Sequence, residues 1–121
     1  MTLIDNRGVL LVEDDPLVAR VTILMLKKFD LLVHHVETAE EAWCFLRDSA
    51  GKLHFILSDM NLRGGQDGVE LLHDVHQQFP EIPLMLTTGS AIDPPEFILD
   101  CLQKPTRLND VRASLEQHGL L

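Results

Sequence analysis

The sequence predicts an α/β fold in which helices cover both faces of a parallel sheet. Short apolar runs of strand length alternate along the chain with segments of helical periodicity. The runs are apolar at consecutive positions, which is typical of strands that are buried on both faces. With 121 residues, 45% of them hydrophobic, the chain is expected to form a single domain over residues 1–121.

The first predicted strand is Gly8–Val12, and it runs directly into the acidic segment 13–15. Either Asp14 or Asp15 is expected to cap the next helix, because Pro16 is well placed in the first helical turn. The positions that we expect this helix to turn toward the core are Val18, Val21, Leu24, Met25 and Phe29.

A second strand is predicted over Leu31–Val36, followed by a helix that opens with a capping box between Thr38 and Glu41. Its expected inward positions are Ala39, Ala42, Trp43 and Leu46. After a break at 49–52, the third strand covers 55–58 and runs into Asp59. A glycine-rich loop then contains Gly64, Gly65 and Gly68.

The remaining predicted elements are a helix over 69–79, a strand over 84–87 that leads into Thr88, and a last strand over 97–102. Thr106 is expected to open the final helix and Gly119 to end it. This order predicts a flavodoxin-like, doubly wound, five-stranded parallel sheet with right-handed crossovers.

Composition excludes several classes of function. The chain has 10 Lys+Arg against 19 Asp+Glu, a net charge of −9, and no block of basic residues, which argues against direct nucleic-acid or membrane binding. Cys44 and Cys101 are far apart and form no CxxC pair, so we expect them to be reduced core residues. The first residues contain no long apolar run, and a cytoplasmic protein or module without a signal peptide is predicted.

Polar residues of three kinds follow the predicted strands. Carboxylates stand at Glu13, Asp14 and Asp59, a hydroxyl at Thr88 and an ammonium at Lys104. Because ligands of open parallel sheets bind beyond the carboxyl ends of the strands, these groups are expected to share one site. Each pair of carboxylates about 4 Å apart repels by roughly 4 kcal/mol, so the cluster requires a cation. An all-oxygen pocket of this kind suits Mg²⁺ together with a phosphoryl group.

At these residues the chain resembles the receiver domains of two-component signalling proteins. The resemblance covers nearly the whole chain through four motifs in order, namely Val-Leu-Leu-Val-Glu-Asp-Asp, then Ile-Leu-Ser-Asp-Met-Asn-Leu with Asp-Gly-Val-Glu-Leu-Leu, then Pro-Leu-Met-Leu-Thr-Thr-Gly, and Lys-Pro. It implies a phosphorelay switch that takes its phosphoryl group from a sensor histidine kinase or a histidine phosphotransfer protein. It also implies slow self-dephosphorylation rather than the activity of an independent enzyme.

Carried over by position, the resemblance implies that Asp59 is the phosphoacceptor, that Thr88 is the switch hydroxyl, and that Lys104 contacts the phosphoryl group. The implied Mg²⁺ ligands, for which Mn²⁺ can substitute, are Glu13, Asp14, Asp59 and the backbone carbonyl of Asn61. The Lys104–Pro105 bond is the one that is usually cis in this family.

The chain departs from the family pattern in two ways. Only 16 positions separate Thr88 from Lys104 (104 − 88), and Asp93-Pro94-Pro95 would break a helix there. The family's fourth helix is therefore predicted to be reduced or absent. Cys101 also stands where the family usually has an aromatic switch residue, three positions before the lysine.

Other functions fit the sequence less well. A receiver-like scaffold that works without phosphorylation is the main alternative. A flavin or nucleotide binder lacks a glycine-rich loop directly after the first strand. An independent phosphotransferase lacks a second acid suitably spaced after Asp59. His73 and His76 share a helix face, yet a solvated surface is expected there rather than a metal site.

Overall fold

The computed structural model describes residues 7–62 and 67–121, so the predicted turn at Gly64 and Gly65 lies outside the described residues. Its strands are β1 (Gly8–Val12), β2 (Leu32–Val36), β3 (Leu53–Asp59), β4 (Leu84–Thr88) and β5 (Asp100–Gln103). Its helices are α1 (Pro16–Lys27), α2 (Ala39–Ser49), the 3₁₀ turn η1 (Ala50–Lys52), α3 (Gly68–Gln78) and α4 (Leu108–Gln117).

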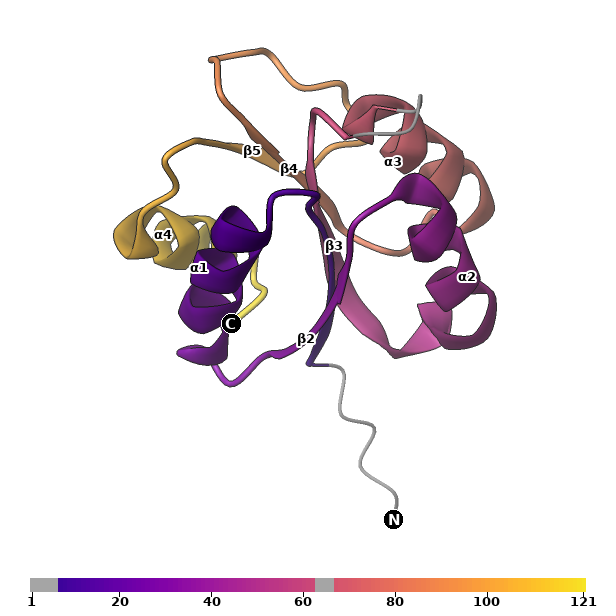
Figure 1. Cartoon of the computed structure of the whole chain (residues 1–121), viewed down its shortest axis with the longest axis horizontal. Helices are drawn as coiled ribbons and strands as arrows, with labels where there is room; N and C mark the ends of the chain where they lie inside the picture. Colours follow the sequence, from indigo (N-terminus) through magenta and orange to yellow (C-terminus); the bar gives the residue numbers. More distant parts are fainter. Residues whose placement is uncertain (1–6, 63–66) are drawn as a thin grey trace.

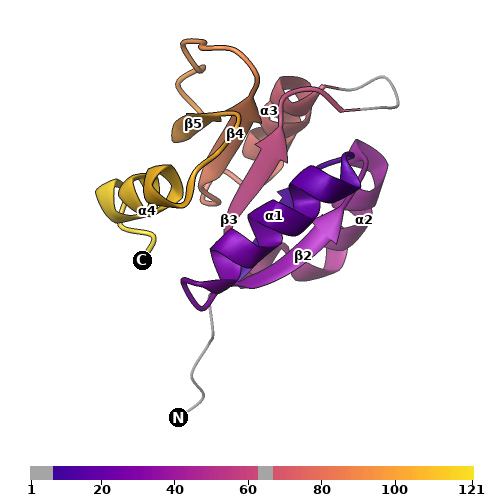
Figure 2. The ribbon, with the colours of Figure 1, turned by 60° about the vertical axis from the view of Figure 1, so that its left-hand side comes forward.

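The strands form one sheet in the order β2-β1-β3-β4-β5, and every neighbouring pair is parallel. In Figure 1 the sheet lies between α1 and α4 on one face and α2 and α3 on the other. Figure 2 shows α1 packed along the sheet beside β2. The predicted doubly wound, flavodoxin-like fold is confirmed.

Alternate strand residues supply two separate cores, one on each face of the sheet. Leu10, Ile56 and Leu86 point toward the core that α2 and α3 close. Phe55 and Leu57 point toward the core on the α1 and α4 face. All five side chains are at most 1% exposed, which explains why these strands read as uninterrupted apolar runs.

The capping predictions for the first two helices are confirmed. Asp15 is the cap of α1, and its Oδ1 accepts from the backbone N–H groups of Leu17 and Val18 at 2.9 and 3.3 Å. In α2 the Thr38 hydroxyl accepts from the N–H of Glu41 at 3.1 Å. Asp15 is thereby a capping residue, which leaves Asp14 for another role.

The predicted inward stripe of α1 is wrong at two positions. Val21 and Leu24 are 55% and 58% exposed, whereas Ala19, Thr22 and Leu26 are buried. The small Ala19 and Thr22 let the helix pack close to the sheet, and the Thr22 hydroxyl is satisfied by donating to the carbonyl of Val18 at 2.8 Å. Val21 and Leu24 therefore face solvent.

Two boundaries near the C-terminus also differ from prediction. The last strand begins at Asp100 rather than at residue 97, because the Ile98 N–H bonds to the carbonyl of Pro95 in a turn. The last helix begins at Leu108 with Arg107, not Thr106, at the capping position. Its end at Gly119 is confirmed by a φ of 69°, which glycine adopts without strain.

No helix occurs in residues 89–99, all of which the structure describes, between β4 and β5. The predicted reduction of the family's fourth helix is thus confirmed. The label α4 in Figure 1 denotes the C-terminal helix that packs beside α1.

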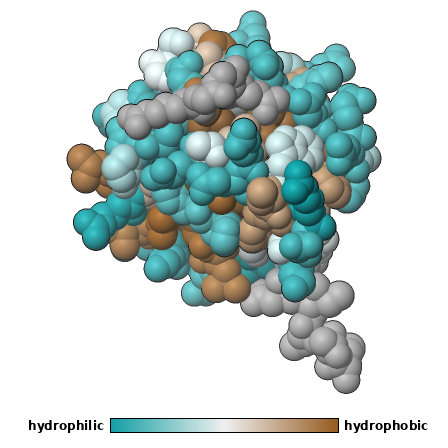
Figure 3. All heavy atoms as spheres, turned by 45° about the vertical axis from the view of Figure 1, so that its right-hand side comes forward, coloured by the Kyte–Doolittle hydropathy of each residue, from teal (hydrophilic) through white to brown (hydrophobic). Residues whose placement is uncertain are grey.

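The face shown in Figure 3 is mostly hydrophilic, with smaller hydrophobic areas between the polar side chains. None of the helices in the described ranges is both long and apolar enough to cross a membrane. The large apolar side chains therefore lie mainly in the two cores, with exceptions that gather on α1.

The two free cysteines are expected to differ in reactivity toward a thiol reagent. Burial, followed by the nearby Asp100 carboxylate, raises the pKa of Cys101, so less of the reactive thiolate is present at a given pH. The core position expected for Cys44 is wrong, because it lies on the exposed side of α2. Cys101 should therefore react several times more slowly than Cys44 at pH 8 and speed up as the pH rises. Mass spectrometry of alkylated peptides measures both rates. In the unfolded protein the two rates should become similar. Equal rates in the folded protein would contradict this expectation.

Candidate functional site

The register of the sheet brings the predicted site residues together at its carboxyl edge. Val12 of β1 pairs with Ser58 of β3, so the residues that follow on each strand, Glu13 and Asp59, lie side by side. Asp59 in turn pairs with Thr87 of β4. The strand order reverses between β1 and β3, which is where ligands of this fold class bind.

The acidic cluster consists of Glu13, Asp14 and Asp59. One carboxylate oxygen from each residue lies within 4.8 Å of the others. Glu13 and Asp59 are only 2% and 6% exposed, while Asp14 is half-buried. Three of the four predicted metal ligands are therefore brought together.

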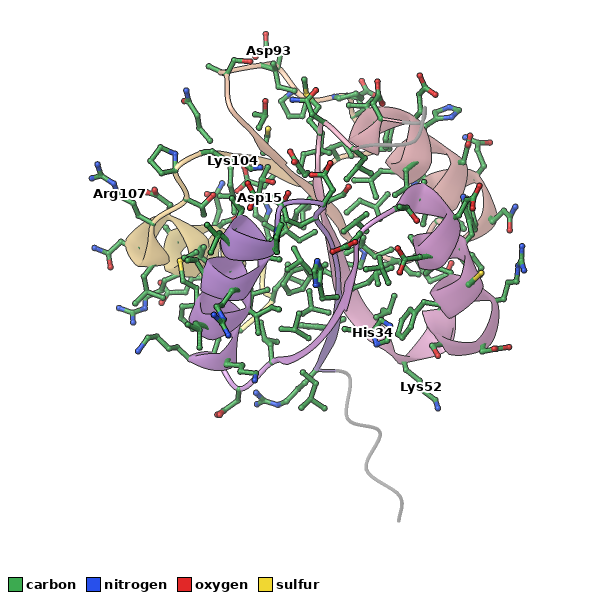
Figure 4. All side chains as sticks on the ribbon, viewed as in Figure 1. Asp15, His34, Lys52, Asp93, Lys104 and Arg107 are labelled. Atoms are coloured by element: carbon green, nitrogen blue, oxygen red, sulfur yellow. The ribbon has the colours of Figure 1, made fainter. Side chains whose placement is uncertain are left out.

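Lys104 joins this cluster from the end of β5. Its Nζ lies 3.1 Å from Glu13 Oε1 and 3.1 Å from Asp59 Oδ2. Figure 4 shows Lys104 with Asp15 and Asp93 at the upper end of the molecule, away from His34 and Lys52 at the opposite end. One ammonium thus bridges two buried carboxylates, in the site that the sequence predicted these residues to share.

The electrostatics of the cluster remain unbalanced despite this lysine. Burial, and then repulsion from Asp59, raises the pKa of Glu13, although the Asp15 N–H and Lys104 oppose the rise. For Lys104, burial lowers the pKa, but hydrogen bonds to Asp59 and Glu13 outweigh it, and the pKa is raised overall. The ionised form of Glu13 would therefore gain from a further positive charge.

A divalent cation is the group that fits this imbalance. The donor set is made of carboxylate oxygens, which Mg²⁺ prefers, and it includes Asp14, whereas the next residue, Asp15, caps α1. The Asn61 N–H donates to Asp59 Oδ1 at 3.3 Å, which places Asn61 beside the cluster. The role predicted for its carbonyl stays a prediction.

Thr88 lies at the end of β4, is 1% exposed, and accepts hydrogen bonds from Lys104 and Ser90. Its carbonyl accepts from the Lys104 N–H at 2.7 Å, and its Oγ1 accepts from the Ser90 N–H at 3.3 Å. The Lys104–Pro105 bond is cis, as predicted. The strands therefore hold Thr88 and Lys104 in a fixed relation beside Asp59.

Two residues that support the site were missed by the sequence reasoning. Position 68 has room only for glycine, because a Cβ there would lie 2.1 Å from the Asp59 carbonyl oxygen. His35 on β2 donates from Nε2 to the Glu13 carbonyl at 2.7 Å. The Asp67-Gly68 step of the third motif signals the first residue, whereas no pattern around His35 signals the second.

The chain is similar to known proteins along most of its length. The family model described as the response regulator receiver domain matches residues 9–116. A signal receiver domain of a modulated diguanylate cyclase from Desulfovibrio desulfuricans G20 is 27% identical, with a TM-score of 0.75 and coverage of 93% of this chain and 94% of that one.

Two further solved structures have similar folds. A signal receiver domain of a putative Luxo repressor protein from Vibrio parahaemolyticus is 25% identical, with a TM-score of 0.80 and coverage of 93% and 89%. The signal receiver domain of an HD domain-containing protein from Pseudomonas fluorescens Pf-5 is 24% identical, with a TM-score of 0.79 and coverage of 93% of each chain. With the family model spanning nearly all of it, this chain belongs to the response regulator receiver domain family.

Proposed function

We propose that Asp59 accepts a phosphoryl group from a phosphohistidine and that Glu13, Asp14 and Asp59 hold Mg²⁺ during the transfer. The observation that carries this proposal is the Lys104 ammonium 3.1 Å from both Glu13 and Asp59, inside a buried cluster of acids. Such a cluster is costly to fold unless further positive charge offsets it, and a bound cation would also attract the oxygens of a phosphoryl group.

In the proposed reaction, a carboxylate oxygen of Asp59 attacks the phosphorus of the donor. A P–O bond forms as the P–N bond of the phosphohistidine breaks, which leaves an acyl phosphate and a free imidazole on the donor. Lys104 is already at Asp59 Oδ2 and would neutralise a phosphoryl oxygen, and Thr88 would donate its hydroxyl to another. Bound Mg²⁺ would supply the remaining positive charge around the phosphoryl oxygens.

The same groups would also surround the phosphoryl group when it is lost from Asp59 and the signal ends. We propose that the acyl phosphate is lost slowly by attack of water at the exposed side of the pocket, so the domain is a self-modifying switch rather than an independent enzyme. We further propose that it works in the cytoplasm, where histidine kinases present their phosphoryl groups, and that a protein partner or a tethered domain reads its state.

The proposal is tested by phosphorylation with acetyl phosphate, a small donor that needs no partner. Intact-protein mass spectrometry should show the mass increase of one phosphoryl group in the presence of Mg²⁺ and none when EDTA removes the metal. A domain that stays unmodified with Mg²⁺ present would favour the phosphorylation-independent scaffold instead.

The surface for the protein donor is proposed to be α1. This helix exposes Leu17, Val21 and Leu24, spaced so that they share one face. Its 12 residues contain Arg20 and Lys27 but no acid, in a chain of net charge −9. A donor helix with apolar and acidic side chains would complement this face.

A groove beside α1 leads from this apolar face to the site. It has a volume of about 480 Å³, which is in the usual range of binding clefts. Its lining residues are Leu17, Val18, Val21, Thr22, Met25, Lys104, Pro105 and Thr106. Because Lys104 also contacts Asp59, a donor that covers the groove would bring its phosphohistidine to the acceptor.

Val21→Asp is expected to slow phosphotransfer from a phosphorylated histidine phosphotransfer protein by about tenfold or more, since loss of a buried interface anchor costs about 1.4 kcal/mol or more. Phosphorylation by acetyl phosphate should stay unchanged, because the substitution lies outside the acidic cluster. Leu32→Asp is the matched control, since Leu32 is 63% exposed on β2 and does not line the groove. The donor should be the one that phosphorylates the wild-type domain fastest in a panel of histidine phosphotransfer proteins. If Val21→Asp and Leu32→Asp slowed this transfer equally, docking on α1 would be contradicted.

A further inference from the structure

The segment that replaces the family's fourth helix connects the site to α3. We call residues 89–99 the strap. It leaves β4 directly after Thr88 and returns to β5 at Asp100, and it forms the loop at the top of Figure 1. Asp93 marks its outer part in Figure 4.

At its first end the strap is attached to the switch hydroxyl itself. The Ser90 N–H donates to Thr88 Oγ1 at 3.3 Å. Within the described part of the chain, residues 91–97 donate no hydrogen bond to another backbone group. Ile92 packs against the core that α2 and α3 close, so this apolar contact and the Ser90 bond to Thr88 together position the first half of the strap.

At its other end the strap is anchored on α3 by an aromatic cluster. The Phe97 ring lies with its centroid 5.7 Å from that of His76, stacked at 23°, and 5.5 Å from that of His73, at 71°. Ile98 is 5% exposed and belongs to the core below, and the Leu99 N–H bonds to the Leu84 carbonyl at 2.7 Å. Phe97 is thus the strap side chain that packs on α3, directly before the two strap residues that are fixed to the core and to β4.

We propose that this strap carries the phosphorylation signal to α3, with Phe97 moving against His73 and His76. The inference rests on the proposed phosphorylation of Asp59. A Thr88 hydroxyl that turns toward a phosphoryl oxygen leaves the Ser90 N–H. The strap then shifts, because Ile92 holds its first half by an apolar contact that can slide rather than by a backbone hydrogen bond. Phe97, which anchors the strap on α3, moves with it and changes the ring contacts of His73 and His76.

This arrangement supplies an aromatic responder where the last strand has none. Cys101 occupies the strand position at which the family usually has an aromatic residue, and it has no ring that could turn between two packed positions. Phe97 is large, half-buried and packed on α3 rather than on the sheet edge. The face that changes on phosphorylation is therefore α3 with the strap.

The test is an NMR measurement on the whole chain. Ring carbon and proton resonances of the histidines are recorded before and after addition of beryllofluoride with Mg²⁺, a mimic of the phosphoryl group. His73 and His76 should shift, whereas His34 should not, although it stacks on Phe45 at 4.1 Å in a comparable ring pair. His34 lies at the far end of the molecule from the strap (Figure 4) and serves as the internal control.

Phe97→Leu retains an apolar side chain but removes the ring. It should reduce the response of His73 and His76 several-fold while phosphorylation by acetyl phosphate, followed by intact mass, stays as in the wild type. Thr88→Val, which cannot accept the Ser90 N–H, should also weaken the response.

The outcomes separate this inference from the proposed function. A wild-type domain that gains the phosphoryl mass while His73 and His76 remain unshifted would overturn the coupling and leave the proposed function standing. A normal histidine response in both variants would also overturn it. A wild-type domain that gains no mass would refute the proposed function and the coupling with it.

Discussion

Asp59→Asn is expected to reduce phosphorylation of the domain by acetyl phosphate to background. The substitution keeps the size of the side chain, but an amide is not a nucleophile toward phosphorus. It also removes the negative oxygen 3.1 Å from Lys104 Nζ and one of the acids in the cluster. Intact mass and circular dichroism together measure the loss of labelling and the retention of the fold.

The matched control is Asp15→Asn. Asp15 is an exposed acid two positions from Glu13, and its carboxylate caps α1 rather than joining the acidic cluster. Asparagine is an equally good capping residue, so both stability and phosphorylation should be retained. Full labelling of Asp59→Asn would show that another residue accepts the phosphoryl group.

Gly68→Ala is expected to destabilise the fold by about 3 kcal/mol, at the upper end of the cost of overpacking. The new Cβ would lie 2.1 Å from the Asp59 carbonyl oxygen and 3.0 Å from Met60 Cα. These are backbone atoms held by the bond from the Gly68 N–H to the Met60 carbonyl at 2.8 Å, so they cannot move aside independently. Urea denaturation measures the change in the free energy of unfolding.

Gly51→Ala provides the control for that measurement. Nothing lies within 4 Å of a Cβ at Gly51, so this variant should unfold at nearly the wild-type denaturant concentration. If Gly68→Ala proved as stable as Gly51→Ala, the close approach of α3 to the phosphoacceptor strand would be wrong. Gly68→Ala should also slow phosphorylation, since its clash falls on the backbone of Asp59 itself.

The sheet and the acidic cluster could be predicted because the sequence repeats a strong local signal. Each buried strand is a continuous apolar run with polar residues directly after it, and parallel pairing then places those residues at one edge. Glu13 and Asp59 follow two such strands, β1 and β3, and Lys104 follows β5, whose sequence Asp-Cys-Leu-Gln is a weaker strand signal. No long-range information beyond strand order was needed to bring them together.

Features that depend on packing between elements could not be predicted in this way. The helical period alone does not determine which side of α1 faces the sheet, and the small Ala19 and Thr22 were buried in place of Val21 and Leu24. The contact of His35 with the Glu13 carbonyl depends on the pairing of β1 with β2. The ring contacts of Phe97 with α3 likewise join residues that are distant in sequence.

The central claim is that the acids after β1 and β3 create a metal-dependent acceptor at one aspartate. Its most direct test is to trap the acyl phosphate with borohydride after treatment with acetyl phosphate, and to map the modified residue by peptide mass spectrometry. We predict modification at Asp59 with Mg²⁺ and none with EDTA. Modification at a different residue, or at Asp59 to the same extent without the metal, would contradict the claim.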